Sequence, residues 1–179
     1  MKIVLITLGV MVGLVLVHLL IVGLAPWISA PKQSLKRPAN LQAKPNRDPA
    51  FKGREVTFEA NGVTLAAWLF LPDDQSGPAP CVVMGHGLGG TRDCGLDRYA
   101  ARFSEAGFAV LAFDYRCLGA SGGEPRQLIR IPDQLEDWSA AIAYARSLDR
   151  VDPSKVALWG SSLGGGYAIT AAALDRKAA

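Results

Sequence analysis

The chain has 179 residues, of which 50% are hydrophobic, a length sufficient for one modest domain and a separate apolar segment. Residues 1–53 hold seven basic residues and one acidic residue (+6), whereas the remainder holds 12 basic and 15 acidic residues (−3). This mildly acidic remainder argues against nucleic acid as a partner. The three cysteines cannot all pair within one chain, so their number does not define a redox compartment.

The N-terminal segment contains an uncharged run from Ile3 to Leu24. At about 1.5 Å per residue, a helix of that length crosses a hydrocarbon core of about 30 Å. A cleavable signal peptide is the alternative, but its apolar region usually has about 7 to 15 residues. We therefore expect residues 1–30 to form a single-pass membrane anchor, with the side of the membrane left open.

The next segment, residues 31–53, contains four prolines and scattered Lys and Arg without hydrophobic periodicity. This composition is typical of an extended linker. Its positive charge beside an anchor would suit anionic lipid headgroups, so membrane lipid is one expected partner. A solvated tether is the alternative.

An α/β domain is predicted from residue 54 to residue 179. Alternating apolar residues in Glu55–Ala60, the Asn61-Gly62 turn signal and the strand-like run to Leu71 predict a β-hairpin. Nearly continuous apolar runs at residues 81–84, 108–113 and 156–159 then alternate with helical patterns at 96–106 and after Pro132. The expected order is therefore a hairpin followed by parallel β-α-β-α-β-α.

The sharpest functional motif is Gly160-Ser161-Ser162-Leu163-Gly164, which matches G-x-S-x-G. An apolar run precedes it, and an Ala-rich helical segment at residues 167–174 follows it. A strand, a strained turn and a helix would lift the Ser162 hydroxyl clear of the sheet beside the amide groups of a helix N-terminus. Ser162 is therefore the predicted nucleophile.

The loop that follows residues 81–84 has two interpretations. Gly85, Gly87 and Gly90 fit G-x-G-x-x-G, and Asp114 ends the next strand, which together match a dinucleotide-binding fingerprint. Against this, five residues separate the glycines from the next helix, and a leading hairpin is foreign to that unit. The His86-Gly87 pair instead resembles the loop of serine hydrolases that contributes an oxyanion-hole N–H.

The order of the hairpin, HGLGG, FDYRCLGASGGEP and WGSSLGGG resembles the α/β-hydrolase superfamily. The dienelactone-hydrolase, serine-aminopeptidase and Xaa-Pro-dipeptidyl-peptidase-like branches are the most similar. The resemblance covers residues 54–179 and implies a serine hydrolase that acts on small-molecule or peptide acyl substrates without a cofactor or metal. It implies a nucleophile (Ser162), oxyanion donors (the N–H groups of Leu88 and Leu163), supporting motif residues (His86, Gly87, Gly160 and Gly164) and structural loop residues (Asp114 and Arg116).

The chain departs from that family after Ser162. The resemblance implies a later acid and a later histidine, but no histidine follows Ser162, and Asp175 falls in the helix behind the turn. We therefore expect the N-terminal half of an α/β-hydrolase sheet, catalytically incomplete, with the outer edge of the 156–159 strand unpaired. A non-catalytic membrane-tethered module or an unstable fragment is the alternative.

Overall fold

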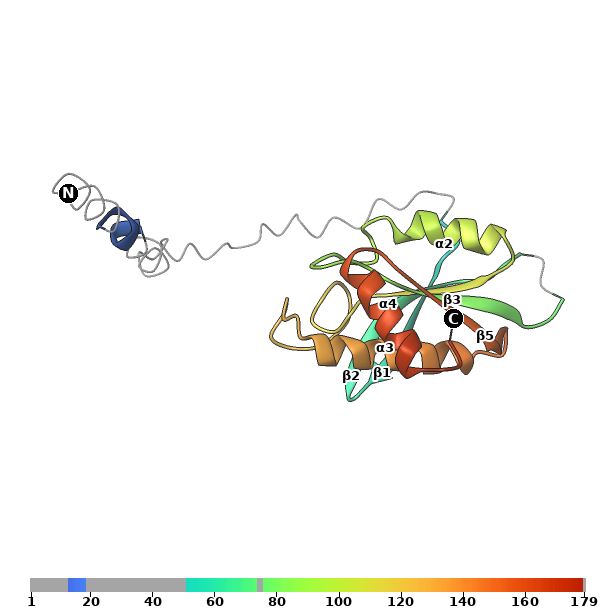
Figure 1. Cartoon of the computed structure of the whole chain (residues 1–179). Helices are drawn as coiled ribbons and strands as arrows, with labels where there is room; N and C mark the ends of the chain where they lie inside the picture. The colour runs from blue at the N-terminus through green and yellow to red at the C-terminus, as the bar shows by residue number, and fades with distance from the viewer. Residues whose placement is uncertain (1–12, 19–50, 74–75, 179) are drawn as a thin grey trace, which may run out of the picture. The chain divides into compact units, whose positions relative to one another are not determined.

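A computed structural model describes residues 13–18, 51–73 and 76–178 (Figure 1). The chain divides into two units, Met1–Ala43 and Lys44–Ala179. In the second unit the described residues form five strands and three helices. They contain the predicted hairpin and the predicted alternation of strands and helices.

The predicted membrane anchor is wrong. Among the residues that the structure describes, no helix is both long enough and apolar enough to cross a membrane. In the first unit only residues 13–18 are described, as an exposed helical segment, and six residues span about 9 Å of the roughly 30 Å required. The predicted single-pass membrane localisation is corrected with it. The other residues of the predicted anchor, and residues 31–50 of the predicted linker, lie outside the described residues.

The second unit is built on five strands: β1 (Arg54–Ala60), β2 (Val63–Phe70), β3 (Ala79–Gly85), β4 (Ala109–Phe113) and β5 (Val151–Gly160). They form one mixed sheet with the order β1-β2-β4-β3-β5. Strands β1 and β2 form the predicted hairpin, and its turn residues Asn61 and Gly62 both have positive φ, as a type I′ turn requires. Strand β2 is antiparallel to β4, whereas β4, β3 and β5 are mutually parallel.

Helices cover both faces of this sheet (Figure 1). Helix α2 (Leu96–Glu105) packs on one face, and helices α3 (Ile131–Arg146) and α4 (Leu163–Leu174) pack on the other. Alternate residues of one strand point to opposite faces. Val82 and Met84 therefore join the cluster beneath α2, while Cys81 and Val83 join the cluster beneath α3 and α4.

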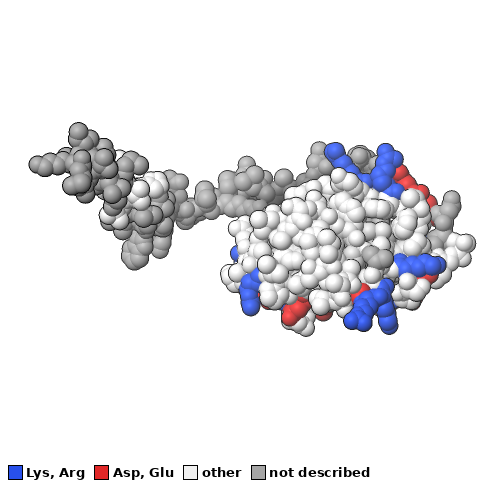
Figure 2. Space-filling view, in the orientation of Figure 1, with Lys and Arg blue, Asp and Glu red and all other residues white. Residues whose placement is uncertain are grey.

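Strand β5 lies at the edge of the sheet. It pairs with β3 along one side, and on its other side the described residues contribute a single parallel bridge, between Val156 and Ala178. The outer edge is therefore largely unpaired in the described part of the chain, as expected. Ile169 and Leu174 of the neighbouring helix α4 are exposed, and most of the surface visible in Figure 2 is uncharged.

Candidate active site

Three loops leave the sheet at the same level. Gly85, the last residue of β3, pairs with Phe113 at the end of β4 and with Gly160 at the end of β5. Because these strands are parallel, the residues after their carboxyl ends gather at one edge of the sheet. The loop that starts at His86 and the turn that carries Ser162 therefore meet there.

Ser162 occupies the turn between β5 and α4, where it is exposed. Its φ of 53° and ψ of −122° match the first central residue of a type II′ turn, a conformation usually taken by glycine. Its side chain makes no capping hydrogen bond to α4, although its carbonyl oxygen accepts the N–H of Gly165 at 2.9 Å. The hydroxyl is therefore presented at the start of a helix without capping it.

The glycines of the two predicted motifs let three backbone segments approach closely. A Cβ on Gly160 would lie 2.1 Å from the carbonyl oxygen of Gly164, and a Cβ on Gly164 would lie 2.4 Å from that of His86. A Cβ on Gly87 would lie 3.3 Å from the Cβ of Ser162. The absence of side chains at these positions is therefore what brings the His86-Gly87 loop against the serine turn.

The two predicted oxyanion donors belong to these adjoining segments. Leu163 is the first residue of α4, so its N–H has no acceptor within the helix and lies at the positive end of the helix dipole. Leu88 directly follows Gly87, the residue beside Ser162, and its side chain is 68% exposed. Both residues therefore belong to segments that lie beside Ser162.

His86 is buried, and its ring is engaged away from the serine. Nδ1 lies 2.9 Å from the carbonyl oxygen of Gly87, which assigns the ring proton to Nδ1 as the donor. Among the residues that the structure describes, Nε2 has no hydrogen-bond partner, and it lies 3.9 Å from Oδ1 of Asp114. Burial lowers the pKa of His86, although the Gly87 carbonyl and the Asp114 carboxylate oppose this effect. His86 is therefore a neutral structural residue of the loop.

Asp114 ties the loop after β3 to the loop after β4, a structural role of the kind that the family resemblance implies for it. Its carboxylate is fully buried and accepts the backbone N–H groups of Arg92 at 2.7 Å and Ala120 at 3.0 Å. The Arg92 guanidinium lies 3.3 Å from the same carboxylate and 2.9 Å from Glu55 on β1. The role of Arg92 is not predictable from the sequence, because no local pattern links residue 92 to β1.

This geometry does not favour the dinucleotide-binding interpretation. The glycine loop continues through an αL residue, Gly95, before α2 starts at Leu96, so the helix does not begin within the glycines. The Asp114 carboxylate is buried, where it accepts backbone N–H groups of Arg92 and Ala120, and it does not face an open site.

In the described part of the chain, no group of three or more His, Cys, Asp and Glu side chains could hold a metal ion.

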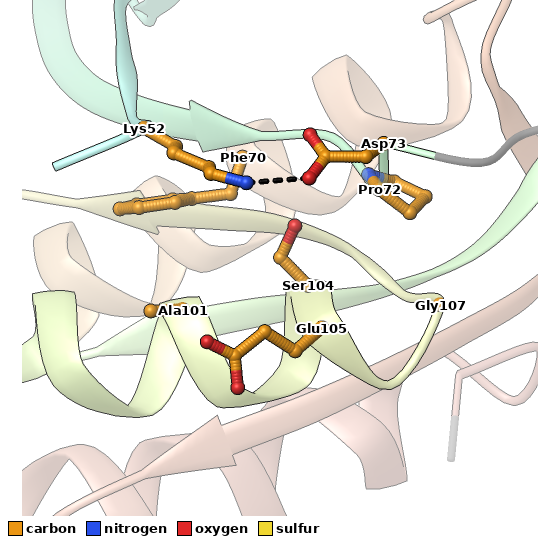
Figure 3. A pocket seen from close by; sticks show the side chains of 8 residues that line it. All are labelled: Lys52, Phe70, Pro72, Asp73, Ala101, Ser104, Glu105 and Gly107. Carbon is orange, nitrogen blue, oxygen red and sulfur yellow. Dashed lines mark hydrogen bonds and ion pairs between the residues drawn. The ribbon is translucent and has the colours of Figure 1, made fainter. Parts of the chain in front are cut away.

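A pocket of about 380 Å³ lies away from the serine turn (Figure 3). Phe70, which lines it, pairs with Val110 near the start of β4, and Gly107 precedes that strand. The pocket therefore belongs to the amino edge of the parallel strands, opposite to the edge of Ser162. Lys52 and Asp73 form an ion pair at its rim.

A doubly covered mixed sheet with a Ser-bearing turn between β5 and α4 defines the class: an α/β-hydrolase fold. The chain belongs to the X-Pro dipeptidyl-peptidase (S15) family, which matches residues 61–179. That assignment agrees with the superfamily predicted from the hairpin and the three motifs that follow it.

Relatives with names or solved structures support the same class. The chain is 51% identical over 125 residues to the quorum-quenching protein AidA of Acinetobacter baumannii. The crystal structure of the α/β hydrolase GrgF from Penicillium sp. matches with a TM-score of 0.67 and 34% identity over 71% of this chain. A hypothetical protein from Pseudomonas aeruginosa matches with a TM-score of 0.70, also at 34% identity, over 76% of this chain.

The chain spans less than half the length of these relatives. The match covers 70% of this chain but 41% of AidA. It covers 43% of the GrgF chain and 43% of the Pseudomonas chain. The activities and substrates of the whole relatives therefore enter only as proposals.

Proposed function

We propose that Ser162 is the nucleophile of a serine hydrolase that acts on ester, thioester or peptide substrates through an acyl-enzyme. The observation that carries this proposal is the strained backbone of Ser162, at φ 53°, exposed at the N-terminus of α4. Strain of this kind concentrates at functional sites, and it presents the hydroxyl to a substrate. The names α/β hydrolase and polyketide transferase, both given to GrgF, support an acyl group as the substrate class.

The chemistry follows from the position of the hydroxyl. Ser162 Oγ would attack the carbonyl carbon, and the carbonyl electron pair would move to the oxygen as an oxyanion. The N–H groups of Leu88 and Leu163 are proposed to hold that oxyanion. Its collapse expels the leaving group, which takes the proton released by the serine, and a water molecule then frees the acid by the same steps.

His86 does not serve as the base in this proposal. Its Nδ1 is engaged by Gly87, and its Nε2 lies toward Asp114 rather than toward a hydroxyl. The other histidine of the sequence, His18, belongs to the Met1–Ala43 unit. Without a base in place, we expect the described unit to react slowly with acylating reagents at neutral pH.

A fluorophosphonate probe tests the nucleophile directly, because its phosphoryl oxygen occupies the oxyanion position of a tetrahedral adduct. The full chain is incubated with the probe at pH 9, where hydroxide compensates for a missing base, and the adduct is located by peptide mass spectrometry. We expect labelling at Ser162 at least about 10-fold faster than in urea-unfolded chain, because a folded oxyanion hole alone is worth about 10²-fold or more.

Ser161 supplies the matched control, since it is an exposed serine in the same turn. Ser162→Ala should abolish the adduct, and Ser161→Ala should retain it. An adduct that survives in Ser162→Ala, or no adduct in the folded wild-type chain, would show that Ser162 is not the nucleophile.

A further inference from the structure

The carbonyl group of His86 is held by a buried side chain from the end of β4. The Tyr115 hydroxyl lies 3.3 Å from the His86 carbonyl oxygen and 3.1 Å from Nε1 of Trp138 on α3. An indole N–H can only donate, so Tyr115 Oη accepts from Trp138 and directs its own hydrogen to His86. The three groups therefore form a one-way chain of hydrogen bonds that ends on the loop backbone.

The Tyr115 hydroxyl is closely packed. Tyr115 and Trp138 are 1% and 0% exposed. A Cβ on Gly85 would lie 2.5 Å from both the Tyr115 hydroxyl and the Trp138 ring. Burial also raises the pKa of Tyr115, so that the hydroxyl remains a donor throughout the working pH range.

The contacted carbonyl belongs to the peptide group that precedes the proposed oxyanion donor. The His86–Gly87 peptide is planar, so a hydrogen bond that holds its carbonyl oxygen also holds N and Cα of Gly87, which lie in the same plane. The position of a Gly87 Cβ is 3.3 Å from the Ser162 Cβ, and Leu88 is the next residue. The orientation of this peptide therefore sets where Gly87 starts. The Gly87 carbonyl oxygen accepts the Gly90 N–H at 3.2 Å and the His86 Nδ1–H at 2.9 Å, and these contacts hold the next peptide, which carries the Leu88 N–H.

We propose that Tyr115 is a positioning residue for the oxyanion hole: oriented by Trp138, its hydroxyl holds the His86 carbonyl and thereby places the Leu88 N–H relative to Ser162. This inference rests on the proposed function. It assigns Tyr115 a role distinct from that of Asp114, which holds the far end of the same loop through Arg92.

Tyr115→Phe tests the proposal, because it removes the hydroxyl and retains the ring. Tyr167→Phe is the matched control: Tyr167 is also a buried tyrosine, and its hydroxyl donates to Oε1 of Gln134 at 2.8 Å, between α4 and α3. We measure the fluorophosphonate labelling rate of Ser162 against probe concentration, and the amide resonances of Gly87 and Leu88 in isotope-labelled chain.

Tyr115→Phe should lower the maximal labelling rate about 10-fold at an unchanged half-saturating concentration, since even a 1 Å misplacement can cost about 10²-fold. It should also shift the Gly87 and Leu88 amide resonances. Tyr167→Phe should label within about twofold of wild type. Labelling of Tyr115→Phe at the wild-type rate, or an equal loss in Tyr167→Phe, would overturn the positioning role.

Two further comparisons distinguish a failure of the proposed function from a failure of the positioning role. If the wild-type chain is not labelled at Ser162, the proposed function fails, and the Gly87 and Leu88 resonances alone decide whether Tyr115 holds the loop. If Tyr115→Phe does not melt cooperatively, Trp138→Phe is tested instead, because it removes the orienting indole N–H. Unchanged resonances in that variant would equally overturn the proposal.

Discussion

Gly164 lies directly against the carbonyl oxygen of His86, so that helix α4 and the loop after β3 touch through bare backbone. A Cβ on Gly164 would approach that oxygen to 2.4 Å and the Gly85 carbonyl oxygen to 2.6 Å. Backbone on both sides cannot yield as a flexible side chain would. We therefore predict that Gly164→Ala lowers the free energy of unfolding by about 3 kcal/mol, measured by urea titration with tryptophan fluorescence.

Gly166 provides the control two residues further along α4. A Cβ there would meet no atom of the described chain within 4 Å, and the residue is helical. Gly166→Ala should raise the free energy of unfolding by about 0.5–1 kcal/mol, because alanine loses less backbone entropy in a helix. Equal effects of the two substitutions would mean that the close approach to His86 does not constrain the turn.

The strained backbone of Ser162 predicts that glycine at this position is more stable than alanine. A non-glycine residue at φ 53° and ψ −122° carries strain of about 1–3 kcal/mol. Ser162→Gly should therefore be about 1 kcal/mol more stable than Ser162→Ala, after the greater unfolded-state entropy of glycine is deducted. Both variants lack the hydroxyl, so the comparison isolates the backbone. Thermal melts in which the glycine variant is no more stable than the alanine variant would contradict the strain.

The sequence predicts the elements of this fold well, but it predicts their ends less well. Helix α4 starts at Leu163 rather than at the predicted Tyr167. Two of the intervening glycines, Gly164 and Gly165, are tolerated despite weak helix propensity because they pack directly on backbone of the loop after β3 and of the end of β5. Strand β5 extends back to Val151, past Pro153 and ahead of the apolar run at residues 156–159, since Val151 pairs with Ala79. In both cases tertiary contacts, rather than local propensity, determine the residue at which the element begins.

The candidate site also has a part that the sequence predicts and a part that it does not. The Ser162 turn is predictable because all its determinants lie within one pentad of sequence. The hydrogen bonds from Trp138 to Tyr115 and from Tyr115 to His86 link residues 23 and 29 positions apart. No periodicity marks such pairs, because the contacts exist only once β3, β4 and α3 have assembled.

His86 predicts a loss of stability in mild acid. Burial lowers its pKa in the folded chain below the ordinary value of 6.5, and the nearby Asp114 carboxylate and Gly87 carbonyl oppose this only in part. Below pH 6.5 the unfolded chain binds a proton that the folded chain does not bind. The free energy of unfolding should therefore fall as the pH drops from 6.5 toward the folded-state pKa, by up to about 1.4 kcal/mol per pH unit.

His86→Asn isolates this contribution, because the asparagine amide can still donate to the Gly87 carbonyl without titrating. Urea titrations between pH 8 and pH 5 should show a flatter pH dependence in the variant than in the wild-type chain. The difference between the two curves removes the titration of Asp137, whose pKa burial raises, and of other carboxylates common to both chains. Parallel curves would show that His86 does not titrate differently in the two states.

Arg116 contacts two adjacent carboxylates whose environments differ. Asp137 is fully buried and accepts the Arg116 backbone N–H at 2.9 Å and Nε at 2.7 Å. Glu136 lies 3.2 Å from the same guanidinium, but its side chain is 48% exposed. The two residues are consecutive on α3 and contact the same guanidinium. Comparing them therefore isolates the effect of carboxylate burial on the strength of the ion pair.

Asp137→Ala should lower the free energy of unfolding by about 3 kcal/mol, because it leaves the largely buried Arg116 and a backbone donor without their acceptor. Glu136→Ala should change it by no more than about 0.5 kcal/mol, since water screens an exposed pair and replaces its hydrogen bonds. Urea titrations of both variants at pH 7 make the comparison. Similar losses would show that the guanidinium is solvated in the folded chain, in which case the loop after β4 is not held to α3 by this pair.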